Sequence, residues 1–251
     1  TSVLEQKNAD LQKTNVELAS FAYVASHDLQ EPLRKIQMFS KRITDAETNL
    51  TENSRDYFSR MKNAAQRMQQ LIEDLLTYSR TGTQERNFFA MDLIQIVNEV
   101  REDLKDEIAS KNVKIITEEL CQCHIIPFQI RQLLSNLITN SIKFARQDMD
   151  PEITIKAAVI NGDNTIHPQL QRDKKYCLIT VRDNGIGFET TFSEQIFGLF
   201  QRLHGKTEYP GTGIGLSICK KIVENHQGVI IAEGRPGNGA TFSMYLPQQQ
   251  S

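Results

Sequence analysis

The first eighty positions of the chain show apolar residues at helical spacing. On a wheel of about 100° per residue with Leu18 at zero, one set of apolar side chains falls within roughly 60° of that origin. It consists of Phe21, Ala22, Ala25, Leu29, Ile36, Phe39 and Ile43. A second stripe consists of Met61, Ala65, Met68, Ile72 and Leu75. The polar stretch 44–54 separates the two stripes and predicts an α-helical hairpin. Two helices cannot bury both stripes alone, so we expect two chains to form a four-helix bundle.

A heptad pattern precedes this hairpin and a polar hinge follows it. Leu4, Leu11 and Leu18 recur every seven residues, which predicts a coiled-coil entry and a homodimer. The segment 81–87 is short, polar and contains the first glycine of the chain. We therefore predict a coiled-coil entry with a dimerisation domain over 1–80, a hinge over 81–87 and a second domain over 88–251.

The remainder of the chain has a mixed α/β texture. Helical patterns cover 92–110, 127–146 and the segment that ends near 226, and β-like runs cover 113–120, 152–160, 175–183, 229–233 and 240–246. This order predicts helices on one face of a mixed sheet. The long connection 188–211 is typical of a lid, which we expect Phe197 and Phe200 to anchor.

Composition narrows the functional classes. The formal charge of −2 and the pI near 6.2 give no basic field, so we expect no nucleic-acid partner. The four cysteines match no zinc or secreted disulfide spacing, and we expect reduced thiols in a cytoplasmic setting, without a metal at Cys121 and Cys123. No apolar run approaches the roughly 18 residues of a membrane span. The start at Thr1 indicates a fragment that lacks an upstream sensor domain.

Two glycine-rich motifs carry the chemistry of a nucleotide site. Asp183 directly follows a predicted strand, and its carboxylate can accept a hydrogen bond from the exocyclic amine of adenine, which guanine replaces by a carbonyl. Gly185 and Gly187 permit a close approach of the base. The segment 211–226 is a glycine-rich turn that opens an amphipathic helix, whose free N–H groups can receive phosphates. The spacing of the two motifs favours one shared site for ATP.

Polar residues on the helix predicted over 127–146 supply the other half of this site. Asn136, Asn140 and Lys143 lie opposite its apolar stripe. An amide oxygen can ligate Mg²⁺, and a lysine can neutralise phosphate. Arg202 lies in the predicted lid, as do His204 and Lys206, for which a solvated loop position is an open alternative.

Several motifs together resemble a known family. LLSNLITNSIKF, VRDNGIGF, IFGLFQRL, GTGIGLSICKKIVENHQG and GNGATFSMYLP are similar, in this order, to the conserved boxes of the histidine-kinase ATP-binding domain. FAYVASHDLQEPLRKI resembles the phosphoacceptor box of phytochrome-like and PAS-linked sensor histidine kinases. The resemblance covers nearly the whole chain. It implies that 1–80 is a dimerisation and histidine-phosphotransfer domain and that 88–251 is a catalytic ATP-binding domain. The fold it implies for the latter is an α/β sandwich of the Bergerat type.

The resemblance also implies roles for single residues. It makes His27 the phosphoacceptor, with Asp28 as its orienting group or base, and Asn140 the Mg²⁺ ligand. The implied ATP contacts are Asn136, Asn140, Lys143, Phe144, Asp183, Gly185, Gly187, Arg202, Gly211, Thr212, Gly213, Gly215, Leu216 and Thr241. The implied partner is the receiver domain of a response regulator, which takes the phosphoryl group on an aspartate. Glu31 departs from the Thr or Asn of relatives that dephosphorylate their partner, which puts that reverse activity in doubt.

Two other functions fit parts of the pattern. A chaperone-like or topoisomerase-like ATPase of the same superfamily needs a catalytic glutamate where this chain has Asn136, and an amide is no general base. A scaffold that binds nucleotide without catalysis would not need the histidine, its acidic neighbour and Asn140 all intact. Both readings therefore rank below the kinase.

Overall fold

A computed structural model describes residues 6, 26, 28–81, 87–162, 170–203 and 211–248. Contacts within the chain separate it into two compact units, Thr1–Gln84 and Glu85–Ser251. Each unit is described by itself below.

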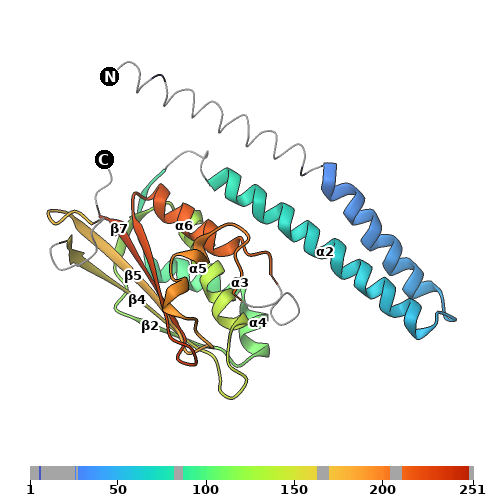
Figure 1. Cartoon of the computed structure of the whole chain (residues 1–251). Helices are drawn as coiled ribbons and strands as arrows, with labels where there is room; N and C mark the ends of the chain where they lie inside the picture. Colours follow the sequence, from blue (N-terminus) through green and yellow to red (C-terminus); the bar gives the residue numbers. More distant parts are fainter. Residues whose placement is uncertain are drawn as a thin grey trace. The chain divides into compact units, whose positions relative to one another are not determined.

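The first unit contains a helical hairpin, as the sequence predicted (Figure 1). One helix covers residues 28–46, and the second, α2, spans Glu52–Thr81. The hydroxyl of Thr51 accepts a hydrogen bond from the backbone N–H of Ser54 at 3.2 Å, which satisfies one free donor at the start of α2. The predicted coiled coil at Leu4, Leu11 and Leu18 lies outside the described residues.

The hairpin leaves much of its apolar surface unburied. Leu33 and Ala65 are buried between the helices, and Gln37 Nε2 donates to Gln69 Oε1 at 3.0 Å across them. Many larger apolar side chains stay exposed on this single chain, including Leu29 at 55% and Phe39 at 53%. The others are Ile36, Met38, Ile43, Tyr57, Met61, Met68 and Leu75. Exposed apolar side chains in this number are typical of a helix pair that packs against another protein surface.

The second unit is an α/β sandwich around a five-stranded sheet of order β2-β4-β5-β7-β6. Its strands are β2 (Lys114–Glu118), β4 (Glu152–Asn161), β5 (Lys175–Asp183), β6 (Val229–Gly234) and β7 (Ala240–Pro247). The β2–β4 pair is parallel and the other pairs are antiparallel. Three helices, α3 (Leu93–Asp103), α5 (Pro127–Lys143) and α6 (Gly215–Asn225), cover one face of the sheet in Figure 1. The fold class predicted from the sequence is confirmed.

Some details of this unit differ from the prediction. The helix expected over 92–110 is interrupted at Leu104, after which α4 (Lys105–Ser110) begins. A small antiparallel sheet of β1 (Phe89–Asp92) and β3 (Gln122–Ile125) was not predicted, because strands of four residues give too little alternation. Of the two expected anchors of the 188–211 connection, Phe197 is buried, but Phe200 is 59% exposed, at a backbone turn with a φ of 61°.

The cysteines differ most from expectation. Cys123 and Cys177 form a disulfide, so the prediction of four reduced thiols is wrong for this pair. Cys121 lies against both of them, although we did not expect a pair at Cys121 and Cys123. Residues two apart on an extended chain share a face, which brings these two sulfur atoms to 3.9 Å. Cys219 is a free, buried thiol on α6 whose pKa burial raises to about 12.

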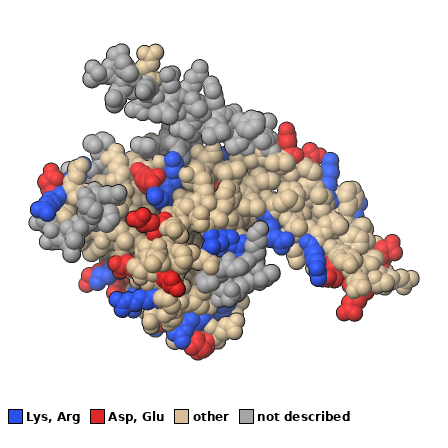
Figure 2. Space-filling view, viewed as in Figure 1, with Lys and Arg blue, Asp and Glu red and all other residues tan. Residues whose placement is uncertain are grey.

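The surface of the described residues is mixed in charge. Figure 2 shows acidic and basic side chains interspersed on the visible face, in keeping with a formal charge of −2. Among the helices described, none combines the length and apolar character that crossing a membrane requires.

Candidate functional site

Asp183, the last residue of β5, is the centre of a hydrogen-bond cluster. Its Oδ1 accepts from the backbone N–H of Gly185 at 2.9 Å and of Ala240 at 3.1 Å. Its Oδ2 accepts from the Ser141 hydroxyl at 3.1 Å. Burial raises the pKa of Asp183, and the three donors oppose this rise by favouring the carboxylate. The cluster fixes the carboxylate rigidly and leaves one acceptor position on Oδ2 for a ligand.

The glycines beside Asp183 leave no room for side chains. A Cβ on Gly185 would lie 2.6 Å from the carbonyl oxygen of Phe144. Gly187 has a φ of 64°, and its Cβ would lie 2.1 Å from the carbonyl oxygen of Arg235. Gly239 has a φ of 80°, and a Cβ on it would collide with the Asp183 carbonyl oxygen. The glycines therefore let the loops after β5 and before β7 close around the aspartate.

The last turns of α5 present the predicted polar residues beside this cluster. Asn140 and Lys143 are both half-buried, and Phe144 follows the helix. The Lys143 ammonium lies 4.5 Å from the centre of the Phe144 ring. Burial lowers the pKa of Lys143, and the positive charge of Arg202 lowers it further. Two cations held this close favour the binding of an anion between them.

Asn136 lies one turn earlier on α5 and has a second partner. Its Nδ2 donates to the carbonyl oxygen of Gly215 at 3.2 Å, and its Oδ1 accepts from Gln132 at 3.2 Å. Asn136 therefore links α5 to the first turn of α6. Both groups of the Asn136 amide therefore have partners within the protein. A residue whose role was limited to contacting nucleotide would not need these partners.

The glycine-rich turn before α6 approaches Lys143 and Arg202. A Cβ on Gly211 would lie 2.6 Å from Lys143 Nζ, and Arg202 Nη1 donates to the Gly211 carbonyl oxygen at 2.9 Å. Gly213 has a φ of 77° and lies against the backbone of residues 200 and 201. The Thr212 hydroxyl accepts from the Ile214 N–H at 3.4 Å, and Leu216 is half-buried in the first turn of α6. The structure thus brings α5, this turn and Arg202 together.

Thr241 does not join the cluster. Its Cα pairs with that of Arg182 across β5 and β7, and paired residues point to the same side of a sheet. Asp183 follows Arg182 in β5, so its side chain points to the other side, towards α5. The residue beside Asp183 is instead Ala240, through its backbone N–H. The structure therefore has Ala240, and not Thr241, beside Asp183, and the contact of Thr241 with the base stays a prediction.

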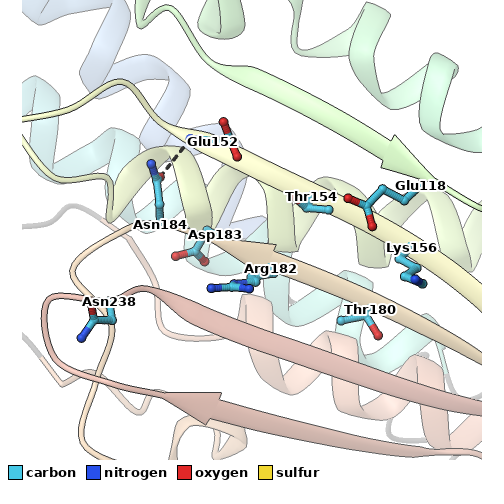
Figure 3. Close-up of a pocket in the computed structure, with 9 residues that line it drawn as sticks. All are labelled: Glu118, Glu152, Thr154, Lys156, Thr180, Arg182, Asp183, Asn184 and Asn238. Carbon is cyan, nitrogen blue, oxygen red and sulfur yellow. Dashed lines mark hydrogen bonds between the residues drawn. The ribbon is translucent and has the colours of Figure 1, made fainter.

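A hollow of about 420 Å³ lies on the sheet face that carries Arg182 (Figure 3). Thr154, Lys156 and Thr180 line it from β4 and β5, and Glu118 from β2. Asp183 and Asn184 reach only its end, where the Glu152 N–H donates to Asn184 Oδ1 at 2.9 Å. Polar and charged residues line the hollow, which lacks the glycines and α5 residues described above, so we do not assign the nucleotide to it.

The predicted acceptor residues belong to the other unit. His27 lies outside the described residues, and Asp28 is exposed in the helix described over 28–46.

Sequence reasoning missed Ser141, because a serine among apolar residues of a helix resembles a tolerated core position. The strand period of GATFSM places Ala240 and Phe242 on the helix side of the sheet. This period is the sequence signal that Thr241 points to the other side.

Two family models match the chain. Residues 17–84 match the His Kinase A (phospho-acceptor) domain. Residues 126–250 match the histidine kinase-, DNA gyrase B- and HSP90-like ATPase domain. The first match lies within the first unit, and the second match lies within the second unit.

Curated relatives include two cyanobacterial phytochromes. The chain is 38% identical over 248 residues to the phytochrome-like protein Cph1 of Synechocystis sp., covering 97% of this chain and 31% of Cph1. It is 39% identical to cyanobacterial phytochrome A of Nostoc sp., covering 97% of this chain and 30% of that protein. The chain thus spans about a third of the length of these relatives.

Solved structures share the fold. Full-length ShkA in complex with AMPPNP matches with a TM-score of 0.67 at 21% identity, over 92% of this chain and 46% of that one. Histidine kinase ThkA in complex with the response regulator TrrA matches with a TM-score of 0.61 at 20% identity, over 99% of this chain and 67% of that one.

Proposed function

The chain belongs to the histidine kinases, and from that premise we propose that it transfers the γ-phosphoryl group of ATP to His27 and then to an aspartate of a receiver domain. The observation that carries the proposal is the cluster around Asp183. Its remaining acceptor position fits the exocyclic amine of adenine, and the carbonyl of guanine would be repelled there. Gly185 lets the backbone after Asp183 pass close to the Phe144 carbonyl oxygen, which keeps the carboxylate in position for the base.

The phosphates of ATP bind between the end of α5 and the turn that precedes α6. Lys143 and Arg202 supply positive charge, and the N-terminus of α6 supplies free N–H groups. Asn140 would hold Mg²⁺ through its amide oxygen, since the amide of Asn136 is taken by Gly215 and Gln132. One amide oxygen with phosphate oxygens and waters suits this cation, which when bound neutralises charge on the transferring phosphate.

His27 attacks the γ-phosphorus in line with the bond that breaks. Nε2 forms the new N–P bond as the P–O bond to ADP breaks, and Asp28 holds the Nδ1–H so that the lone pair of Nε2 faces the phosphate. The transfer depends on alignment and charge neutralisation more than on covalent chemistry by the protein. The ATP-binding unit moves on the segment 81–87 to reach the histidine.

Two partners complete the cycle. A second copy of the chain covers the exposed apolar face of the hairpin, where Leu29 and Phe39 lie. A response regulator receiver domain then accepts the phosphoryl group; ThkA was solved with such a partner. Glu31, four residues after His27, is paired with Lys35 at 2.6 Å and is an acceptor without a proton to donate. Glu31 therefore gives no support for dephosphorylation of the partner.

Incubation with γ-labelled ATP and Mg²⁺ tests the proposal. We expect label that acid removes and base does not, and its loss in His27→Gln. The matched control is His124→Gln, because His124 lies in the ATP-binding unit on β3. Acid-stable label, or label that persists in His27→Gln, would contradict the assignment.

A further inference from the structure

Three cysteine sulfur atoms meet at one end of the ATP-binding unit. Cys121 precedes β3, Cys123 lies in it, and Cys177 lies near the start of β5. Their Sγ atoms all lie within 4.8 Å of one another. Cys123 and Cys177 are almost fully buried and disulfide-bonded, whereas Cys121 is half-buried. The cluster therefore has one side open to solvent.

This cluster is separate from the nucleotide site. Cys177 and Asp183 lie towards opposite ends of β5, six positions apart, which corresponds to about 20 Å along a strand. No residue proposed above to bind ATP contacts any of the three sulfur atoms through a described hydrogen bond. The kinase chemistry leaves the cluster without a role.

The spacing of the sulfur atoms fits a metal–thiolate site. A zinc–sulfur bond of about 2.3 Å and tetrahedral angles place two ligand sulfurs about 3.8 Å apart. Cys121 Sγ lies 3.9 Å from Cys123 Sγ and 3.5 Å from Cys177 Sγ. Two of the three separations thus already suit a common cation, and the third becomes adjustable once the disulfide is reduced.

We propose that the reduced chain binds one thiophilic divalent cation of the Zn²⁺ type through Cys121, Cys123 and Cys177. Thiolates select soft or borderline cations over Mg²⁺ and Ca²⁺. A thiol reductant supplies two electrons and two protons to convert the Cys123–Cys177 disulfide into two thiols. The cation then displaces the three thiol protons to solvent without changing its own oxidation state. Water reaches the fourth position from the side of Cys121.

The site joins two sheets. Cys123 belongs to the β1–β3 sheet and Cys177 to the main sheet, so the cation forms a cross-link between them in the reduced state. The disulfide forms the same link in the oxidised state. Metal binding and oxidation therefore exclude each other, since both use the sulfur atoms of Cys123 and Cys177.

Zinc titration of the 251-residue chain under reducing, oxygen-free conditions tests the site. Against a chromophoric chelator, we expect one Zn²⁺ per wild-type chain. We expect its loss in Cys121→Ser and Cys177→Ser and its retention in Cys219→Ser. Cys219 is the matched control because it is a buried free thiol on α6 outside the cluster. The oxidised wild type should bind no Zn²⁺.

A second measurement avoids variants that fail to fold. Zn²⁺ should protect Cys121, the half-buried thiol of the cluster, from alkylation in the folded, reduced wild type. The fully buried Cys219 should stay unmodified with and without Zn²⁺, and peptide mass analysis assigns the modification to each cysteine. Cd²⁺ should produce a thiolate charge-transfer band with the same stoichiometry. Zinc binding equal in wild type and Cys177→Ser, or no protection of Cys121, would overturn the proposal.

Discussion

The substitution Asp183→Asn separates nucleotide recognition from folding. Asparagine can keep the local hydrogen bonds, because its Oδ1 can accept from the N–H groups of Gly185 and Ala240 and its Nδ2 can donate to the Ser141 hydroxyl. Ser141 already donates to the Leu137 carbonyl oxygen at 3.0 Å, so it is able to become the acceptor. The amide N–H then meets the amine of adenine, and two donors face each other.

The expected loss follows from the hydrogen bond that disappears. A hydrogen bond to a charged group contributes about 1.5–3 kcal/mol, which corresponds to an increase of about 10- to 100-fold or more in the Kd for ATP. Stability should change in the opposite direction. Because burial raises the pKa of Asp183, its contribution to stability is present below the unfolded pKa and is lost as the pH rises through the folded one. At neutral pH the neutral asparagine avoids this penalty, so the Tm should equal or exceed that of the wild type.

Isothermal titration with an ATP analogue and thermal unfolding of the same samples measure both effects. Asp173→Asn, which changes an exposed aspartate of the same unit, is the control for the loss of one charge. Wild-type affinity in Asp183→Asn would refute the role of Asp183 in base recognition. A strongly lowered Tm would refute the hydrogen-bond exchange with Ser141.

Three further outcomes are expected. Gly187→Ala should lower the Tm more than Gly237→Ala. Both glycines have a positive φ, which strains an alanine by about 1–2 kcal/mol, but only the Cβ at Gly187 would also meet a carbonyl oxygen, at 2.1 Å. Equal shifts of the Tm in thermal unfolding would contradict this contact. The affinity for ATP should fall as the pH rises through the lowered pKa of Lys143, because the charged form of Lys143 binds phosphate. In equilibrium titrations, Lys143→Met should bind ATP more weakly than the wild type, and its affinity should depend less on pH. Phe39→Asp should shift the chain from dimer to monomer in sedimentation, since Phe39 is 53% exposed on the single chain. The control Lys41→Ala, which changes another exposed residue of the same helix, should not shift it. An unchanged dimer in Phe39→Asp would exclude Phe39 from the interface.

The sequence was sufficient for the regular part of the fold. The run KYCLITVRD predicted a strand over 175–183, and β5 has these bounds. The separation of apolar and polar faces on the helix 127–146 correctly predicted that Leu134 and Ile138 are buried while Asn140 remains accessible. Such predictions succeed because a long amphipathic element repeats its signal several times. The helix predicted over 92–110 failed at Leu104, since the apolar period alone does not reveal a local break between α3 and α4.

Side-chain direction at a strand end was harder to predict. Thr241 was assigned by resemblance of its motif to a family pattern, and a motif read by residue type tolerates a shift of one position. A strand does not, because each step reverses the side of the sheet. The pairing of Thr241 with Arg182 therefore removes it from the side of Asp183, while the backbone of Ala240, which carries no chemical signal in the sequence, reaches the carboxylate.

The cysteine cluster depended on contacts that no local pattern contains. Cys121 precedes β3 and Cys123 lies in it, and sequence periodicity missed this strand of four residues. Cys177 is 54 positions beyond Cys123. Their meeting requires β3 to pair with β1 and the resulting small sheet to pack against the start of β5. A zinc motif recognised by spacing presupposes ligands on one or two local turns. Ligands that come from two different sheets become visible only when the register of both sheets is known.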